Sequence, residues 1–247
     1  MNGKVLLSYF SGTGNTYKVV ETCGKMLEDN GYDPVIHPIN SGNELTDNGY
    51  EFYGFYFPVY ALGLPRIVRK YLSELKSLPV KKKAFLIVTG GDKDNNGWSL
   101  KEGIEILERK NIETVYSDLI QMPNNWAYEK MNPENEVVVM LDNAVKKTKD
   151  IMARFLAGET YHKPLNLQKF GKPLSKIIFY LFHKHGVKKI WKLFRVDRAC
   201  TGCGLCASKC PAGAIIMKDG RTSWNRLCEI CTRCINFCPI NAVGYWG

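Results

Sequence analysis

The sequence lacks the features that would place it in a membrane or outside the cell. No uninterrupted apolar run reaches the roughly 18 residues that a membrane-spanning helix needs. The N-terminus, MNGKVLLSYF, has no basic segment, no long apolar core and no small-residue cleavage site, so it does not resemble a secretory signal. With 247 residues, we expect a cytoplasmic protein of one large or two ordinary domains.

Cysteine is nearly absent from most of the chain and crowded at its end. Of nine cysteines, eight lie in the last 48 residues. Disulfide frameworks belong to small secreted domains, so metal chemistry is the better interpretation of this crowding. Cys23 stands alone in a predicted helix and is expected to be a buried bystander.

The formal net charge of +10 is concentrated in one segment. Residues 163–198 carry a net charge of +9, residues 1–162 carry −2 and residues 199–247 carry +3. Arginine is scarce in the basic segment, where only Arg195 and Arg198 occur, and this argues against a nucleic-acid-binding face.

Two interpretations of the basic segment remain open. In the first, its large apolar side chains pack between two domains. In the second, the segment contacts a membrane surface or an acidic partner, as basic amphipathic stretches do. The residues expected to pack in the first interpretation are Ile177, Ile178, Leu181, Phe182, Ile190, Trp191 and Phe194.

Strand-like and helix-like patterns alternate along the first 160 residues. The predicted strands are 4–10, 34–39, 51–60, 83–89 and 114–122. The predicted helices are 16–30, 65–78, 99–110 and a long one that runs to about residue 156, with Asn132 as its N-cap. This alternation predicts right-handed βαβ crossovers and an α/β, doubly wound, five-stranded parallel sheet. Ligands of such sheets bind beyond the carboxyl ends of the strands, here in the loops after strands one, three and four.

The loop after the first strand has the composition of a phosphate site. Its residues lie between a strand and a helix, where backbone N–H groups face an anion. The dinucleotide pattern fails because Tyr17 occupies its third glycine position, and no Gly-Lys-Ser/Thr follows for a Walker loop. What remains is a hydroxyl-rich loop without lysine: Ser11, Gly12, Thr13, Gly14, Asn15 and Thr16.

From Tyr9 to Thr16 the sequence YFSGTGNT resembles the FMN phosphate loop of flavodoxins. The resemblance implies that two further loops flank the flavin ring and that Tyr60 stacks on it. The second loop would be Pro58, Val59, Tyr60, Ala61, Leu62 and Gly63; the third would be Thr89, Gly90, Gly91 and Asp92. Backbone amides at Gly90 and Gly91 would reach the ring edge.

Two cysteine runs near the C-terminus share one spacing. CTGCGLCASKCP and CEICTRCINFCP both read C-x2-C-x2-C-x3-C-P, the spacing of bacterial two-cluster ferredoxins, in which the fourth cysteine binds the other cluster. Evenly spaced triplets do not match the paired ligands of zinc modules. One 4Fe–4S cluster would use Cys200, Cys203, Cys206 and Cys238; the other would use Cys228, Cys231, Cys234 and Cys210.

As a whole the chain is similar to fusions, found mainly in anaerobes, of a flavodoxin-like domain with a small α+β bacterial ferredoxin-like domain. The expected organisation is an FMN domain at 1–160, a basic linker at 161–195 packing between domains, and a two-cluster domain at 196–247. The resemblance implies FMN and two 4Fe–4S clusters that exchange electrons. The expected partner is a redox protein, either reduced ferredoxin or an oxidoreductase.

An alternative function is an FMN-dependent reductase of a small acceptor, either a quinone or a ferric chelate, fed through the clusters. No general acid or base stands out in the sequence. Asp92, Tyr60 and Trp126 are candidates only because they lie in the predicted loops.

Overall fold

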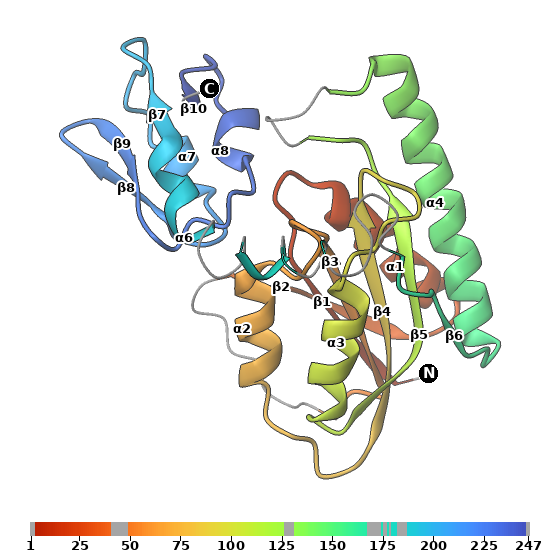
Figure 1. The fold of residues 1–247 in the computed structure, drawn as a ribbon. Coiled ribbons are helices and arrows are strands. Elements are labelled where there is room, and N and C mark those ends of the chain that lie inside the picture. The colour runs from red at the N-terminus through yellow and green to blue at the C-terminus, as the bar shows by residue number, and fades with distance from the viewer. Residues whose placement is uncertain are drawn as a thin grey trace.

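The computed structural model covers the whole chain. It describes residues 3–40, 49–125, 131–166, 174, 177, 179–181 and 187–245; the side chains of Val187 and Lys188 are not described. Figure 1 shows a larger α/β part and a smaller C-terminal part placed beside one end of it. We call residues 3–166 the sheet domain and residues 194–245 the module.

The sheet domain is built on a parallel sheet with strand order β2-β1-β3-β4-β5-β6. The order of the first five strands is that of flavodoxin-like doubly wound folds, so the predicted fold class is confirmed. The sequence analysis did not anticipate β6, a two-residue strand at the β5 edge. The strands are β1 (Lys4–Tyr9), β2 (Asp33–Pro38), β3 (Phe52–Pro58), β4 (Lys82–Gly90), β5 (Ile112–Gln121) and β6 (Tyr161–His162).

Helices cover both faces of this sheet (Figure 1). One apolar core forms against α2 and α3 and includes Leu72 and Ile106, whereas the other forms against α1 and α4 and includes Val20 and Ile151. Strands buried on both sides explain the nearly continuous apolar runs in the sequence. The helices are α1 (Asn15–Asp29), α2 (Arg66–Glu74), α3 (Ser99–Glu108) and α4 (Glu134–Leu156).

The start of α4 differs from the expectation that Asn132 caps it. Pro133 holds the N-cap position without a side-chain cap. The Asn132 side chain instead accepts a hydrogen bond from the Asn124 amide at 2.7 Å. Glu134 and Glu136 in the first turn supply the negative charge that favours a helix start.

The module is small and is organised around its cysteines. Two short antiparallel pairs, β7 with β10 and β8 with β9, frame it. Its core holds few large apolar side chains, among them Phe194, Trp224 and Ile230, together with several cysteines. Its elements are β7 (Phe194–Val196), α7 (Leu205–Ser208), β8 (Ile215–Lys218), β9 (Arg221–Trp224), α8 (Arg233–Asn236) and β10 (Val243–Tyr245).

The basic segment agrees only in part with the expectation that it packs between domains. Ile190, at the end of α6 (Val187–Ile190), Trp191, in η2 (Trp191–Leu193), and Phe194 all pack in the core of the module. Ile177 and Leu181 are exposed instead. Ile178 and Phe182 lie outside the described residues.

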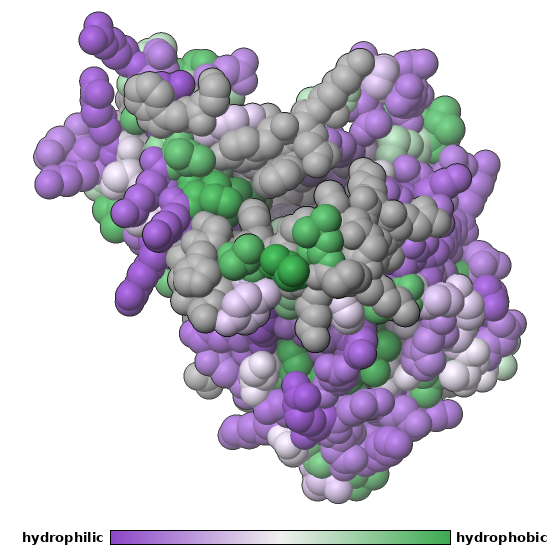
Figure 2. All heavy atoms as spheres, viewed as in Figure 1, coloured by the Kyte–Doolittle hydropathy of each residue, from purple (hydrophilic) through white to green (hydrophobic). Residues whose placement is uncertain are grey.

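Figure 2 shows hydrophobic groups gathered between the module and the sheet domain, on a face that is otherwise largely hydrophilic. In the described part of the chain, no helix is both long and apolar enough to cross a membrane.

Candidate functional site

The switch in strand order lies between β1 and β3, and three loops follow the carboxyl ends of β1, β3 and β4 there. We call them loop 1 (11–16), loop 2 (58–63) and loop 3 (89–92). Parallel pairing brings Pro58 opposite Thr89, and the Val59 amide donates to the Thr89 carbonyl at 2.8 Å. The loops predicted to bind a cofactor are therefore neighbours in space.

Loop 1 is braced by its own hydroxyl groups. The buried Ser11 Oγ accepts a hydrogen bond from the Gly14 amide at 3.0 Å, which leaves the Ser11 hydroxyl hydrogen free to donate. Gly14 has φ 117°, in the region that favours glycine. Thr16 Oγ1 lies 2.8 Å from Thr89 Oγ1 and ties loop 1 to loop 3.

The backbone of loop 1 presents a set of unpaired donors. Among the described residues, no hydrogen-bond acceptor faces the amides of Gly12, Thr13, Asn15 or Thr16. These amides open the 15-residue helix α1, where the helix dipole adds partial positive charge. Loop 1 therefore offers the backbone donors that an anion site needs, and its role as a phosphate site stays a prediction.

Loop 2 is a tight turn that holds Tyr60 against the sheet domain. The Tyr60 and Gly63 amides each donate to the other residue's carbonyl at 2.9 Å, and Ala61 and Leu62 have φ values of 45° and 65°. The Tyr60 ring meets Phe10 edge-on, with centroids 6.2 Å apart. Burial raises the pKa of the Tyr60 hydroxyl well above its usual value, so it stays protonated near neutral pH.

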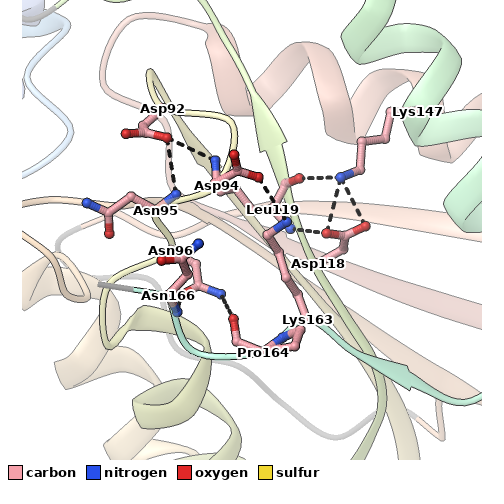
Figure 3. A network of polar contacts seen from close by, with 10 residues as sticks. All are labelled: Asp92, Asp94, Asn95, Asn96, Asp118, Leu119, Lys147, Lys163, Pro164 and Asn166. Atoms are coloured by element: carbon pink, nitrogen blue, oxygen red, sulfur yellow. Dashed lines mark hydrogen bonds and ion pairs between the residues drawn. The ribbon is translucent and has the colours of Figure 1, made fainter. Parts of the chain in front are cut away.

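Loop 3 is held by a polar network that reaches the segment after β6 (Figure 3). Asp92 Oδ1 accepts hydrogen bonds from the Asp94 and Asn95 amides at 2.9 and 3.2 Å. Asn96 donates from Nδ2 to the Pro164 carbonyl at 2.9 Å and accepts from the Asn166 amide at 3.2 Å. Asp92 therefore acts as a turn residue here.

The predicted domain boundaries at 160 and 196 remain predictions. Residues 161–166, at the start of the predicted linker, contact the sheet domain. Residues 190–196, at its end, contact the module.

The eight clustered cysteines surround two adjacent cavities in the module. Cys210, Cys228, Cys231 and Cys234 line the first, which we call the Cys231 cavity. The second, the Cys203 cavity, is lined by the other predicted set, Cys200, Cys203, Cys206 and Cys238. Cys206 borders both cavities. Across the described residues, no three His, Cys, Asp or Glu side chains converge as ligands of a single metal ion; the thiols stand around cavities instead.

The two cavities differ in their exposure. Cys228 and Cys234 are buried, whereas Cys203 is exposed. Burial raises the pKa of the Cys231 thiol to about 11 and that of Cys234 to about 12. Because metal ligands must be thiolates, loading of the Cys231 cavity has to release these protons.

The Cys231 cavity lies directly against loops 1 and 2. A Cβ atom placed on Gly12 would lie 2.7 Å from Tyr60 Oη, 2.9 Å from Cys231 Cβ and 3.0 Å from the Cys231 carbonyl oxygen. Arg233 Nε donates a hydrogen bond to the Gly12 carbonyl. The predicted phosphate loop and a predicted cluster ligand are therefore in contact.

Asn125, after β5, adds a second link between the two parts. Its side-chain nitrogen donates to Thr13 Oγ1, and its carbonyl accepts from Thr232 Oγ1 at 3.0 Å and Asn236 Nδ2 at 3.2 Å. Trp126, one of the acid–base candidates, lies outside the described residues.

A third link joins Glu229 to the start of α2. The buried Glu229 carboxylate accepts from the Arg66 amide at 2.8 Å and lies 3.5 Å from Arg66 Nε. Arg66 Nη2 donates to the Cys228 carbonyl at 2.7 Å. Burial raises the pKa of Glu229, and Arg66 and the amides of Arg66 and Ile67 oppose that rise. A carboxylate of the module therefore caps a helix of the sheet domain.

We expect Glu229→Ala to loosen this junction by about 3 kcal/mol, because it leaves the Arg66 charge and the first turn of α2 without their partner. Hydrogen exchange at the Ile67 to Lys70 amides should then accelerate about a hundredfold. Glu74→Ala is the control, since Glu74 forms only an exposed pair with Lys70. Unchanged exchange in Glu229→Ala would show that the cap does not hold the junction.

Sequence reasoning missed the residues that make this junction. Loop 1 and the cysteine runs have recognisable spacings, but the contacts between the parts join residues 107 to 221 positions apart. Neither a motif nor a periodicity marks such contacts. The residues concerned are Arg66, Asn125, Glu229, Thr232, Arg233 and Asn236.

The comparisons with known proteins give different matches for the two parts of the chain. Residues 199–243 match the family model of the 4Fe-4S dicluster domain. No curated protein matches the chain.

Several solved flavodoxin structures resemble the sheet domain. The flavodoxin from the domain Archaea has 14% identity and a TM-score of 0.41, covering 60% of this chain and 98% of its own. Oxidised flavodoxin 2 from Bacillus cereus has 16% identity and a TM-score of 0.43, covering 62% and 99%. Two-electron reduced Megasphaera elsdenii flavodoxin has 18% identity and a TM-score of 0.41, covering 58% and 98%. These likenesses are too weak to decide a function.

The description of the two parts of the chain therefore rests on the strand order and on the family match. The chain combines a doubly wound sheet of flavodoxin-like order with a C-terminal segment that matches the 4Fe-4S dicluster domain.

Proposed function

We propose that the chain is an electron-transfer protein that passes electrons between two 4Fe–4S clusters and FMN. One observation carries the proposal. Gly12 of loop 1 lies against both Tyr60 of loop 2 and the predicted cluster ligand Cys231. Two cofactor sites that share such a contact suit direct transfer between them.

The residues of the switch point suit FMN. The unpaired amides at the start of α1 would hold its phosphate, together with the hydroxyl groups of Ser11 and Thr13. Loops 2 and 3 run side by side where the ring would lie. The remaining predicted contacts are Gly12, Gly14, Asn15, Thr16, Pro58, Val59, Tyr60, Ala61, Thr89, Gly90 and Gly91.

The two thiol-lined cavities suit iron–sulfur clusters. Each predicted set of four cysteines borders its own cavity, as the fourth-cysteine exchange of two-cluster ferredoxins requires. A 4Fe–4S cluster exchanges single electrons and FMN accepts one or two, so the pair can couple one- and two-electron chemistry.

The chain's own residues fix the geometry of this junction. A hydrogen bond from the Arg66 amide to Glu229 joins the module to α2. Hydrogen bonds of Arg233 and Asn125 join it to loop 1. Tyr60 and Cys231 fill the space over Gly12. These contacts would hold the two sites at a fixed distance.

The direct test is the cofactor content of protein purified without oxygen. Near eight irons and one FMN per chain are expected, and two zinc ions without iron would overturn the cluster assignment. An anaerobic redox titration should then show that the flavin and the clusters equilibrate within one chain. A screen of quinones and ferric chelates on the same sample would separate an electron carrier from a reductase.

Replacement of both Ser11 and Thr13 by alanine should weaken FMN binding about a hundredfold, because hydrogen bonds to a charged group contribute about 1.5 kcal/mol or more each. Flavin fluorescence on titration with FMN measures the affinity. Thr22→Ala is the matched control, since the Thr22 hydroxyl bonds the Lys18 carbonyl within α1. Equal affinity in the double variant and the control would remove the phosphate-site assignment.

A further inference from the structure

The two cavities of the module are not equivalent in their surroundings. Residues of the Cys231 cavity contact the sheet domain: Cys231 packs in the core next to α2, and Glu229, Thr232 and Arg233 form hydrogen bonds with it. Among the residues that the structure describes, none from the sheet domain lines the Cys203 cavity.

The Cys203 cavity has a rim of exposed residues. Among its lining residues, Thr201, Cys203, Pro239 and Ile240 are exposed. Because Cys206 borders both cavities, a continuous series of sites runs from this rim through the Cys231 cavity to Tyr60 and loop 1.

The charge of the module's surface favours an acidic binding partner. Exposed basic side chains outnumber exposed acidic ones over residues 194–245. The basic ones are Arg195, Arg198, Lys209, Lys218, Arg221 and Arg226, and the acidic ones are Asp197 and Asp219. Such a surface attracts and steers an acidic protein.

We propose that the module is polarised: an acidic one-electron carrier protein docks at the rim of the Cys203 cavity, and electrons cross to the flavin site only through the Cys231 cavity. The proposal rests on the proposed function. Each carrier molecule that is oxidised supplies one electron, so two oxidations, with two protons from solvent, balance a two-electron reduction of the flavin.

Three matched substitutions test the docking face. Ile240→Glu alters the rim of the Cys203 cavity, Leu227→Glu alters the neighbour of Cys228, and Ile216→Glu alters β8 away from the lining of both cavities. Their side chains are 44%, 51% and 53% exposed. Each variant therefore adds the same charge at a comparably exposed apolar site.

The probe is an acidic ferredoxin that carries a single cluster, reduced with dithionite and mixed anaerobically with each oxidised variant. In Ile240→Glu the bimolecular rate should fall about tenfold, as for a lost docking contact, while the concentration-independent reduction of the flavin keeps its rate. Ile216→Glu and Leu227→Glu should behave as wild type, and added salt should slow the bimolecular phase. The proposal would be overturned if the bimolecular rate fell only in Leu227→Glu or if all three variants had the same rate. It would also be overturned if added salt left this rate unchanged.

Iron release gives a readout that needs no electron donor. A chelator should remove iron in two equal phases, since Cys203 beside one cavity is exposed whereas Cys228 and Cys234 beside the other are buried. Cys203→Ser should change the fast phase only; a change in the slow phase would reverse the assignment. Iron and FMN contents measured first on the same sample separate failure of this proposal from failure of the proposed function.

Discussion

Removal of iron is expected to unfold residues 194–245 while residues 3–166 stay folded. The module is a segment of about 50 residues, and a chain of that size rarely obtains more than about 3–5 kcal/mol from its core. Its buried apolar side chains are few, and three of the thiols that pack in its core, Cys210, Cys228 and Cys234, are predicted ligands of one cluster. Metal binding therefore has to supply much of its folding free energy.

Hydrogen exchange of the iron-free protein measures this directly. Amides of β8, β9 and α8 should exchange as in an unfolded chain, whereas amides of β3 and β4 keep their protection. Cys23→Ala is the control, because Cys23 is buried in α1 and its loss should leave the iron content unchanged. Protection of β8 and β9 that persists without iron would show that the metals do not hold the module together.

Gly12→Ala is expected to separate the two cofactor sites. The added Cβ would lie within 3.0 Å of Cys231 Cβ and of the Cys231 carbonyl oxygen. Backbone and Cβ atoms cannot move away as the end of a long side chain can, so the module itself has to shift. Such a shift lengthens the distance between the two cofactor sites, and we therefore expect electron transfer within the chain to slow several-fold.

Single-turnover reduction followed at the flavin and cluster absorption bands gives this rate, and the FMN and iron contents of the same sample exclude loss of a cofactor. The comparison variant is Gly24→Ala, in which the new Cβ finds its nearest neighbour, Ile36 Cδ1, at 3.5 Å. If Gly12→Ala transfers electrons as fast as Gly24→Ala, the contact at Gly12 does not set the rate.

The fold was predictable from sequence because local patterns determine it. The apolar run of β4 and the helical spacing of α3 place both elements within a few residues of where they lie. The two-residue strand β6 has no pattern of its own. It forms because the chain after α4 returns alongside β5, where Tyr161 pairs with Tyr116.

The site was predictable only where spacing carries the chemistry. Loop 1 and the cysteine runs have fixed spacings because an anion nest and a cluster require them. The bond from Arg233 to Gly12 has no such signature, since it depends on how two separately folded parts meet. Asn132 illustrates the same limit, because its preference for helix starts yields to a tertiary bond with Asn124.

The bond from Glu229 to Arg66 shows that the two halves of the duplicated cysteine motif have specialised. Between its cysteines the second copy carries Glu229, Thr232 and Arg233, and at the matching positions the first copy carries Thr201, Gly204 and Leu205. At these three positions only the second copy has long polar side chains, Glu229 and Arg233, and both contact the sheet domain. Exchanging the residues between the cysteines of the two copies would therefore keep every ligand yet detach the module, so the copies are no longer interchangeable parts.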